Sequence, residues 1–147
     1  MTNDRLPDPA SLVPIEEEFW TEDGRVPPEA TVAVRGAPIT GDKFLAHAAR
    51  QAREYSLRGR NMAAVSTDLV LPSWPLQRIL AGQLATYSRY ATCPVERLVE
   101  GGFEVLATGA PPHADVVLPV LGIVEAERLA RLFAPTEEAN PHKNRRR

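Results

Sequence analysis

Short runs in which apolar and polar residues alternate predict several strands. Residues 31–35 (TVAVR) alternate and are followed by a Gly-Ala-Pro segment that ends the run. Residues 62–66 and 86–92 have the composition of two more strands. The runs 103–107 and 114–118 are separated by a hairpin-length turn, so we expect them to pair antiparallel to each other.

Between these runs, apolar residues recur three and four positions apart, which predicts three or four helices. The clearest helix covers residues 40–58, with Thr40 as its N-cap and Gly59 just after its end. Further helices are expected to begin at Ser73-Trp-Pro75, to cover Pro94–Glu100 and to cover Val120–Phe133.

These elements predict an α+β fold in a single small domain, with a mixed or antiparallel sheet of four to five strands and three to four helices. A chain of 147 residues suits one domain. Residues 1–29 are rich in proline and acidic residues and predict a flexible arm. The globular domain is expected over residues 30–134, with a disordered basic tail over 135–147.

Composition narrows the functional classes. The formal net charge of −2 argues against a mainly electrostatic nucleic-acid binder, but not against an enzyme that touches RNA briefly. The single cysteine, Cys93, cannot form an internal disulfide and is interpreted as a small apolar filler. Because the chain shows neither the apolar core of a signal peptide nor a membrane-length apolar run, we expect a cytoplasmic location without membrane contact.

Polar residues lie at the predicted ends of strands, where several strands can contribute to one cleft. Arg35 ends the first strand and could bind a phosphate through two hydrogen bonds. His113 borders the hairpin turn and could exchange protons near neutral pH. Thr108, at the other border, or Ser66, at the end of the second strand, could orient a hydroxyl group. Tyr87 could stack on a base.

Each candidate also has a structural interpretation. Arg35 could pair with an acid at a strand end, and His113 could be a turn residue bonded to the backbone. His47, a further candidate for substrate binding, borders the apolar face of its helix, which favours packing over catalysis. The run Ser66-Thr67-Asp68 is typical of a turn cap. The three histidines, His47, His113 and His142, lack the spacing of metal ligands, so no metal site is expected.

Arg35, Thr108 and His113 together have the chemistry of a metal-free endoribonuclease. An imidazole can take the proton of the RNA 2′-hydroxyl while a guanidinium stabilises the charge that grows on the phosphate. Because RNA supplies its own nucleophile, such an enzyme needs none. This hypothesis predicts an RNA or nucleotide substrate and no cofactor.

Val34-Arg35-Gly36, a helix bearing His47, and Gly102-Phe103 with Thr108 and Pro112-His113 together form a pattern that resembles small uncharacterised actinobacterial proteins that look toxin-like. The resemblance covers residues 31–119. It implies a toxin-type enzyme centred on Arg35, Thr108 and His113. It also implies a cognate antitoxin or immunity protein as partner.

The order Arg35, Ser66-Thr67 and Glu104 is similar to the Arg–Ser–Glu pattern of ADP-ribosyltransferases. This second resemblance implies NAD as cofactor, with Arg35 contacting NAD and Ser66-Thr67 supporting the pocket. It implies that Glu104 stabilises an oxocarbenium-like transition state. The Ser-Thr pair lacks a following serine, and no Glu or Gln stands two residues before Glu104, which places this hypothesis second.

A third hypothesis is a non-catalytic interaction protein, such as an antitoxin, an immunity protein or an adaptor. It rests on the acidic run Glu16-Glu17-Glu18 and on Trp20 in the N-terminal arm. The arm would then bind a basic partner, and alanine at both Arg35 and His113 would leave the activity unchanged.

Overall fold

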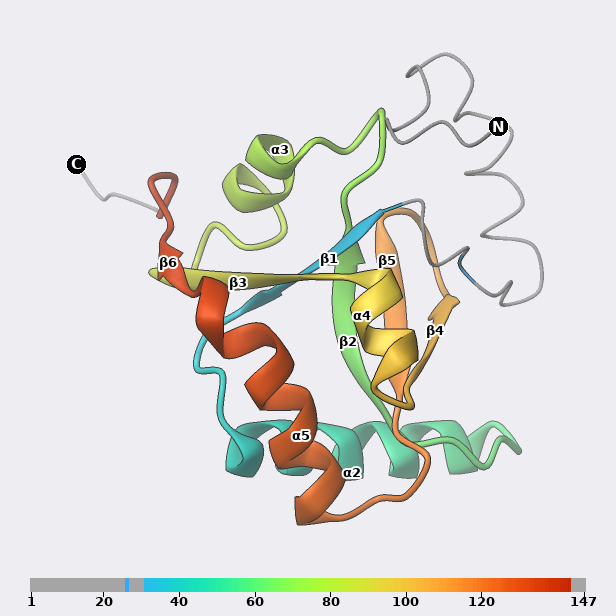
Figure 1. Cartoon of the computed structure of the whole chain (residues 1–147). Coiled ribbons are helices and arrows are strands. Elements are labelled where there is room, and N and C mark those ends of the chain that lie inside the picture. The colour runs from blue at the N-terminus through green and yellow to red at the C-terminus, as the bar shows by residue number, and fades with distance from the viewer. Residues whose placement is uncertain (1–25, 27–30, 144–147) are drawn as a thin grey trace, which may run out of the picture.

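The computed structural model describes residue 26 and residues 31–143 (Figure 1). Predictions for the N-terminal arm, including Glu16-Glu17-Glu18 and Trp20, therefore lie outside the described residues. Val26 is buried, and its N–H donates to the carbonyl of Val105 at 3.0 Å. This contact fixes residue 26 against the sheet.

The described residues form one α+β domain around a six-stranded sheet. All of its paired strands are antiparallel, in the order β4-β5-β2-β1-β3-β6. The predicted fold class is thereby confirmed. The strands are β1 (Val32–Gly36), β2 (Ala64–Leu69), β3 (Arg89–Pro94), β4 (Glu104–Ala107), β5 (His113–Val117) and β6 (Glu138–Ala139).

Four α-helices accompany the sheet within the described residues: α2 (Gly41–Leu57), α3 (Leu76–Ala81), α4 (Val95–Glu100) and α5 (Ile123–Phe133). The predicted end signals of α2 are confirmed. Thr40 is the N-cap and accepts from the N–H of Lys43 at 3.3 Å. Gly59, just beyond the helix, has a φ of 77°, a conformation that glycine adopts without strain.

The sheet separates two apolar cores because neighbouring residues of a strand face opposite sides. Ala33 of β1 belongs to the larger core, which includes Phe44 of α2 and Phe133 of α5. Val34, the next residue, belongs to a smaller core with residues of α3 such as Ile79. Figure 1 shows α3 above β3 and α5 below it. Every helix within residues 31–143 falls short of the length and hydropathy of a bilayer-spanning segment.

Two strand predictions need correction. The first concerns the end of β2, because this strand continues to Leu69. Ser66, Thr67 and Asp68 therefore lie inside a strand rather than at its end, and the prediction of a turn cap is wrong. The cause is tertiary: β2 pairs with β5 as far as Asp68↔His113, and this pairing overrides the local turn preference. Tyr87 was expected in a strand but lies in the segment before β3, where its N–H donates to the carbonyl of Leu84 at 3.0 Å.

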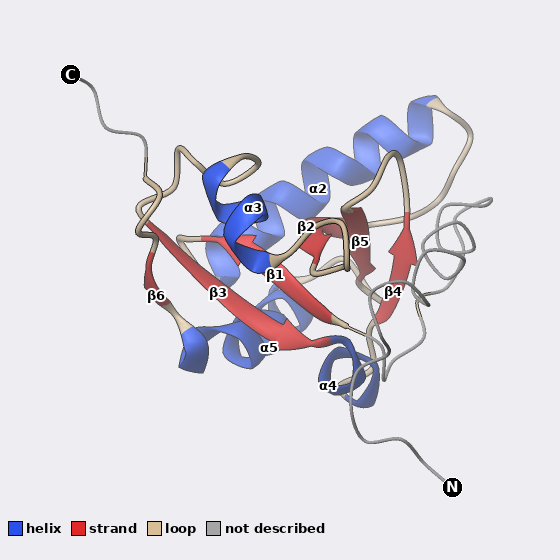
Figure 2. Cartoon of the chain, turned by 90° about the horizontal axis from the view of Figure 1, so that it is seen from above, coloured by secondary structure: helices blue, strands red, loops and turns tan. Residues whose placement is uncertain are grey.

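Residues 135–143 were expected to be disordered, yet they belong to the 3-10 helix η2 (Ala134–Thr136), then to β6, then to a turn. Asn140 explains the order of this segment. Its buried side-chain amide donates to the carbonyls of Leu84 at 2.9 Å and Tyr87 at 3.0 Å. These bonds link the segment to the loop before β3, which Figure 2 shows from above.

Candidate active site

The site begins where β1 and β2 separate. The two strands pair only through Ala33↔Leu69 and Val34↔Asp68, whereas β1 remains paired with β3 as far as Gly36. The main-chain groups of Ser66 face this wedge and need other partners, since buried backbone donors and acceptors are rarely left unpaired.

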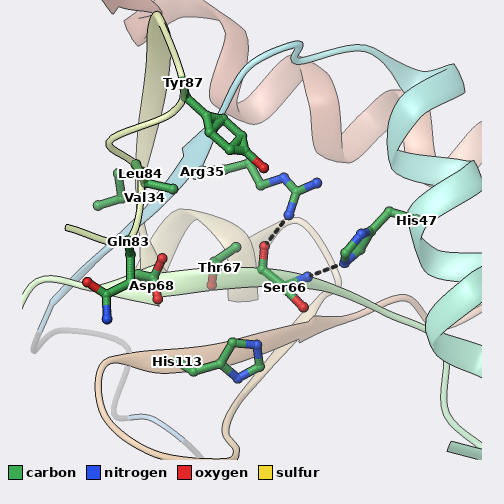
Figure 3. Close-up of a pocket in the computed structure, with 11 residues that line it drawn as sticks. Val34, Arg35, His47, Ser66, Thr67, Asp68, Gln83, Leu84, Tyr87 and His113 are labelled. Carbon is green, nitrogen blue, oxygen red and sulfur yellow. Dashed lines mark hydrogen bonds between the residues drawn. The ribbon is translucent and has the colours of Figure 1, made fainter. Parts of the chain in front are cut away.

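Two side chains supply those partners, as the dashed lines in Figure 3 show. Nη1 of Arg35 donates to the carbonyl of Ser66 at 2.7 Å. The N–H of Ser66 donates to Nε2 of His47 at 3.1 Å. Arg35 and His47 thus replace the strand pairing that is missing beside Ser66.

A cavity of about 310 Å³ opens beside the wedge (Figure 3). It brings together residues that are far apart in the sequence, from α2, β1, β2, β5 and the loop before β3. Arg35 and His113 line this one cavity, so both candidates for phosphate binding and proton transfer reach the same space. The predicted site residues that line the cavity are Arg35, His47, Ser66, Tyr87 and His113. Asp68 and Gln83 line it as well, although neither was a predicted site residue.

Arg35 keeps hydrogen-bonding capacity toward an anion. Burial lowers the pKa of Arg35, but a guanidinium remains charged at neutral pH. Its Nε is buried and has no acceptor among the described residues, where the group also forms no ion pair. A guanidinium can bind two oxygens of a phosphate through two parallel N–H groups. The alternative of a strand-end pair with an acid is therefore not seen among residues 31–143.

His47 is an acceptor for the backbone. Burial, together with the neighbouring charges of Arg35 and Arg50, lowers its pKa to about 4. The ring is therefore neutral near pH 7. Because the N–H of Ser66 can only donate, Nε2 must accept and the proton must lie on Nδ1. This favours the predicted packing role over catalysis.

His113 is held by the hairpin turn. Its Nδ1 lies 3.0 Å from the carbonyl oxygen of Thr108, which can only accept, so Nδ1 carries a proton. Nε2 has no hydrogen bond within the described residues and lies 4.0 Å from Oδ1 of Asp115. The side chain is 38% exposed. His113 is thus bonded to the turn backbone through Nδ1, while its Nε2 forms no hydrogen bond within residues 31–143.

Thr108 positions His113 from below the cavity surface. It is buried, and it is not among the residues that line the cavity. Its hydroxyl donates to Oδ2 of Asp115 at 3.0 Å and lies 3.0 Å from Nδ1 of His113. Oδ2 of Asp115 also accepts from the hydroxyl of Tyr55 on α2. Thr108 therefore contacts His113 and Asp115 and does not reach the cavity where a substrate hydroxyl could lie.

The buried Tyr55–Asp115 contact should matter for stability. Burial and the Asp115 carboxylate raise the pKa of Tyr55 to about 12. We expect Tyr55→Phe to lower the free energy of unfolding by about 1–3 kcal/mol, because it removes a donor from a buried acceptor. Urea unfolding measures the change. Tyr90→Phe is the matched control, since its hydroxyl bonds to exposed Glu138, and equal losses in both variants would contradict this assignment.

Asp68 is the site residue that the sequence interpretation missed. Burial raises the pKa of this carboxyl group, which has no hydrogen bond or ion pair within the described residues. It is the cross-strand partner of His113, and both line the cavity. The available signal was alternation: in a strand, Ser66 and Asp68 share one face, and Thr67 takes the other.

Tyr87 closes one side of the cavity (Figure 3). Its ring rests directly on the backbone of β1 at Gly36. A Cβ at that position would lie 2.0 Å from Cδ2 of Tyr87, so a residue larger than glycine would displace the ring. Figure 3 shows the Tyr87 hydroxyl pointing toward the Arg35 side chain. An aromatic face and a guanidinium thus lie next to each other at the cavity wall.

Other predicted residues lie elsewhere. Glu104 is on β4, separated from β2 by β5, and does not line the cavity, so Arg35, Ser66 and Glu104 do not gather there. Nε2 of His142 lies 2.6 Å from Oε1 of Gln77.

Burial raises the pKa of the Cys93 thiol to about 11, which keeps it protonated and unreactive. Within residues 31–143, no three His, Cys, Asp or Glu side chains cluster as metal ligands would.

The cavity therefore combines a guanidinium, a carboxyl group and an imidazole. Arg35, Asp68 and His113 supply them. Within residues 31–143 the guanidinium Nε, the carboxyl group and the imidazole Nε2 form no hydrogen bond. Comparison with known proteins finds no matching family model, no matching curated protein and no matching solved structure.

Proposed function

We propose that this protein cleaves RNA through attack of the 2′-hydroxyl on the neighbouring phosphodiester. The observation that carries the proposal is that Asp68 and His113, cross-strand neighbours, line the same cavity as Arg35. The reaction needs one group to take a proton, one to give a proton, and a cation for the phosphate. These three residues supply that set.

The reaction balances with these groups alone. The carboxylate of Asp68 takes the proton of the 2′-hydroxyl as its oxygen forms a bond to phosphorus. The bond between phosphorus and the 5′-oxygen breaks, and the imidazolium of His113 gives the Nε2 proton to that oxygen. The products are a 2′,3′-cyclic phosphate and a 5′-hydroxyl. Arg35 stabilises the charge on the non-bridging oxygens through the N–H groups of its guanidinium.

The surrounding residues have supporting roles in this proposal. Tyr87 offers an aromatic face on which a base can stack. Thr108 holds His113 through the contacts at Nδ1, so that Nε2 keeps its place. An enzyme that degrades RNA inside the cytoplasm would slow growth, which is the toxin-type role that the resemblance to toxin-like proteins implies. An antitoxin or immunity protein would then be needed to restrain it.

Product analysis tests the proposal. Purified protein is incubated with a single-stranded RNA in the presence of EDTA, and the products are identified by mass spectrometry. We expect fragments that end in a 2′,3′-cyclic phosphate. DNA of the same sequence is the control, because it lacks the 2′-hydroxyl and should stay intact. Intact RNA, cleaved DNA or a requirement for a divalent cation would each contradict the proposed reaction.

A further inference from the structure

A second cavity, of about 240 Å³, adjoins the first. The two share Arg35, Gly36, His47 and Tyr87, so these residues form the wall between them. Lys43 and Arg50 of α2 line only the second cavity, and they lie on the same helix face as His47. We call this cavity the α2 groove.

The α2 groove gathers positive charge without a counter-charge. Arg35, Lys43 and Arg50 line it, and none of its lining residues is acidic. Within the described part of the chain, no carboxylate forms an ion pair with any of these three cations. Cations held together in a concave site attract an anion strongly.

Two hydrogen-bond donors in the groove also face each other, and residues 31–143 supply no acceptor for the pair. The neutral ring of His47 carries its proton on Nδ1, because Nε2 accepts from Ser66. Nδ1 lies 3.2 Å from Nη2 of Arg50, and a guanidinium nitrogen can only donate. An oxygen of a bound anion beside this pair would accept from both groups and resolve the mismatch.

We propose that the α2 groove binds a second phosphate of a single RNA strand, next to the phosphate in the first cavity. This inference rests on the proposed function and names its substrate class: an oligonucleotide rather than a nucleotide with one phosphate. A strand that crosses the shared wall would place consecutive phosphates on both sides of Arg35. The base between them would lie against Tyr87, since stacking on an aromatic ring tolerates any base.

Binding measurements test the groove independently of cleavage. The probe is a fluorescently labelled 2′-O-methyl hexanucleotide, which lacks the attacking hydroxyl and stays intact. We expect Lys43→Gln/Arg50→Gln to raise its Kd by about 10–100-fold, which is the loss of charged hydrogen bonds to one phosphate. The negative slope of log association constant against log salt concentration should become shallower by about 0.7, as expected for the loss of one single-strand phosphate contact.

Two further variants make the result specific. Arg97→Gln/Arg131→Gln removes two exposed charges from α4 and α5, outside the groove, and should bind like the wild type. Lys43→Arg/Arg50→Lys keeps the charge and should restore binding. Circular dichroism melting checks that each variant is folded. Equal weakening by both glutamine variants, or none in the groove variant, would overturn the inference.

The outcomes also separate this inference from the proposed reaction. Groove-dependent binding by a protein that cleaves no RNA would overturn the reaction and leave the groove as an RNA-binding site. RNA cleavage with unchanged binding in Lys43→Gln/Arg50→Gln would overturn the groove as a phosphate site and leave the proposed reaction in place. Where both hold, the same variant should lose activity on a hexanucleotide far more than on a dinucleoside monophosphate, which has a single phosphate.

Discussion

Replacing His113 by alanine is expected to lower kcat/KM for RNA cleavage by about 10²–10⁴-fold, the usual contribution of a general acid or base. The imidazole is the only group of the cavity that the proposed reaction uses to protonate the leaving 5′-oxygen. The fold should persist, because the side chain is 38% exposed and its loss opens no large space in the core. Initial rates on a fluorogenic RNA substrate measure the effect, and thermal unfolding checks the structure.

The matched control is His142→Ala. This imidazole contacts Gln77 and is not among the residues that line the cavity, so the variant should cleave RNA at the wild-type rate. Expression in bacteria adds a second readout. The intact chain should slow growth, and His113→Ala should relieve the effect whereas His142→Ala should not. A His113→Ala variant that cleaves as fast as the wild type would remove His113 from the reaction.

Fold features that depend on local signals could be predicted from the sequence. Thr40 and Gly59 mark the ends of α2 because capping and a positive φ are properties of single residues. Features that depend on distant partners were missed. The length of β2 follows from pairing with β5, and the order of residues 135–143 follows from the bonds of Asn140 to the loop before β3.

The same distinction applies to the site. That Arg35 and His113 line one cavity agrees with the expectation that residues near strand ends share a cleft. The register that brings them together, with Val34 and His113 both opposite Asp68 of β2, could not be predicted from the sequence. Nor could the partners that define roles. His47 accepts from the N–H of Ser66 because β1 and β2 separate there. Thr108 does not line the cavity, because its hydroxyl donates to Asp115 below the cavity surface. Neither contact can be predicted from the residues next to it in the sequence.

Replacing Asp68 by asparagine is expected to lower kcat/KM by about 10²–10⁴-fold while it stabilises the fold. The amide cannot take the proton of the 2′-hydroxyl, although its shape is nearly that of the acid. The pH–rate profile gives a specific signature. Burial raises the pKa of Asp68, so wild-type activity should fall as the pH drops through that raised value. In the variant this acidic limb should be missing from the residual activity.

The stability change has a definite sign. A carboxyl group whose pKa is raised by folding binds its proton more tightly in the folded state. Wild-type stability therefore falls as the pH rises from the ordinary pKa of aspartate to the raised pKa of Asp68. Asp68→Asn removes this loss, and we expect about 0.5–2 kcal/mol of added stability near pH 7, typical of relieving strain at an active site. The gain should shrink as the pH falls toward the ordinary pKa of aspartate.

Asp42→Asn is the matched control for stability, because this exposed carboxylate lies in the first turn of α2. There a negative charge favours the helix, so the same substitution should destabilise the protein by about 0.3–1 kcal/mol. Chemical unfolding at two pH values compares the variants. Opposite signs would mean that the Asp68 carboxylate is kept at the expense of stability, as expected for a reacting group. Destabilisation by Asp68→Asn would instead trace its lost activity to a damaged fold.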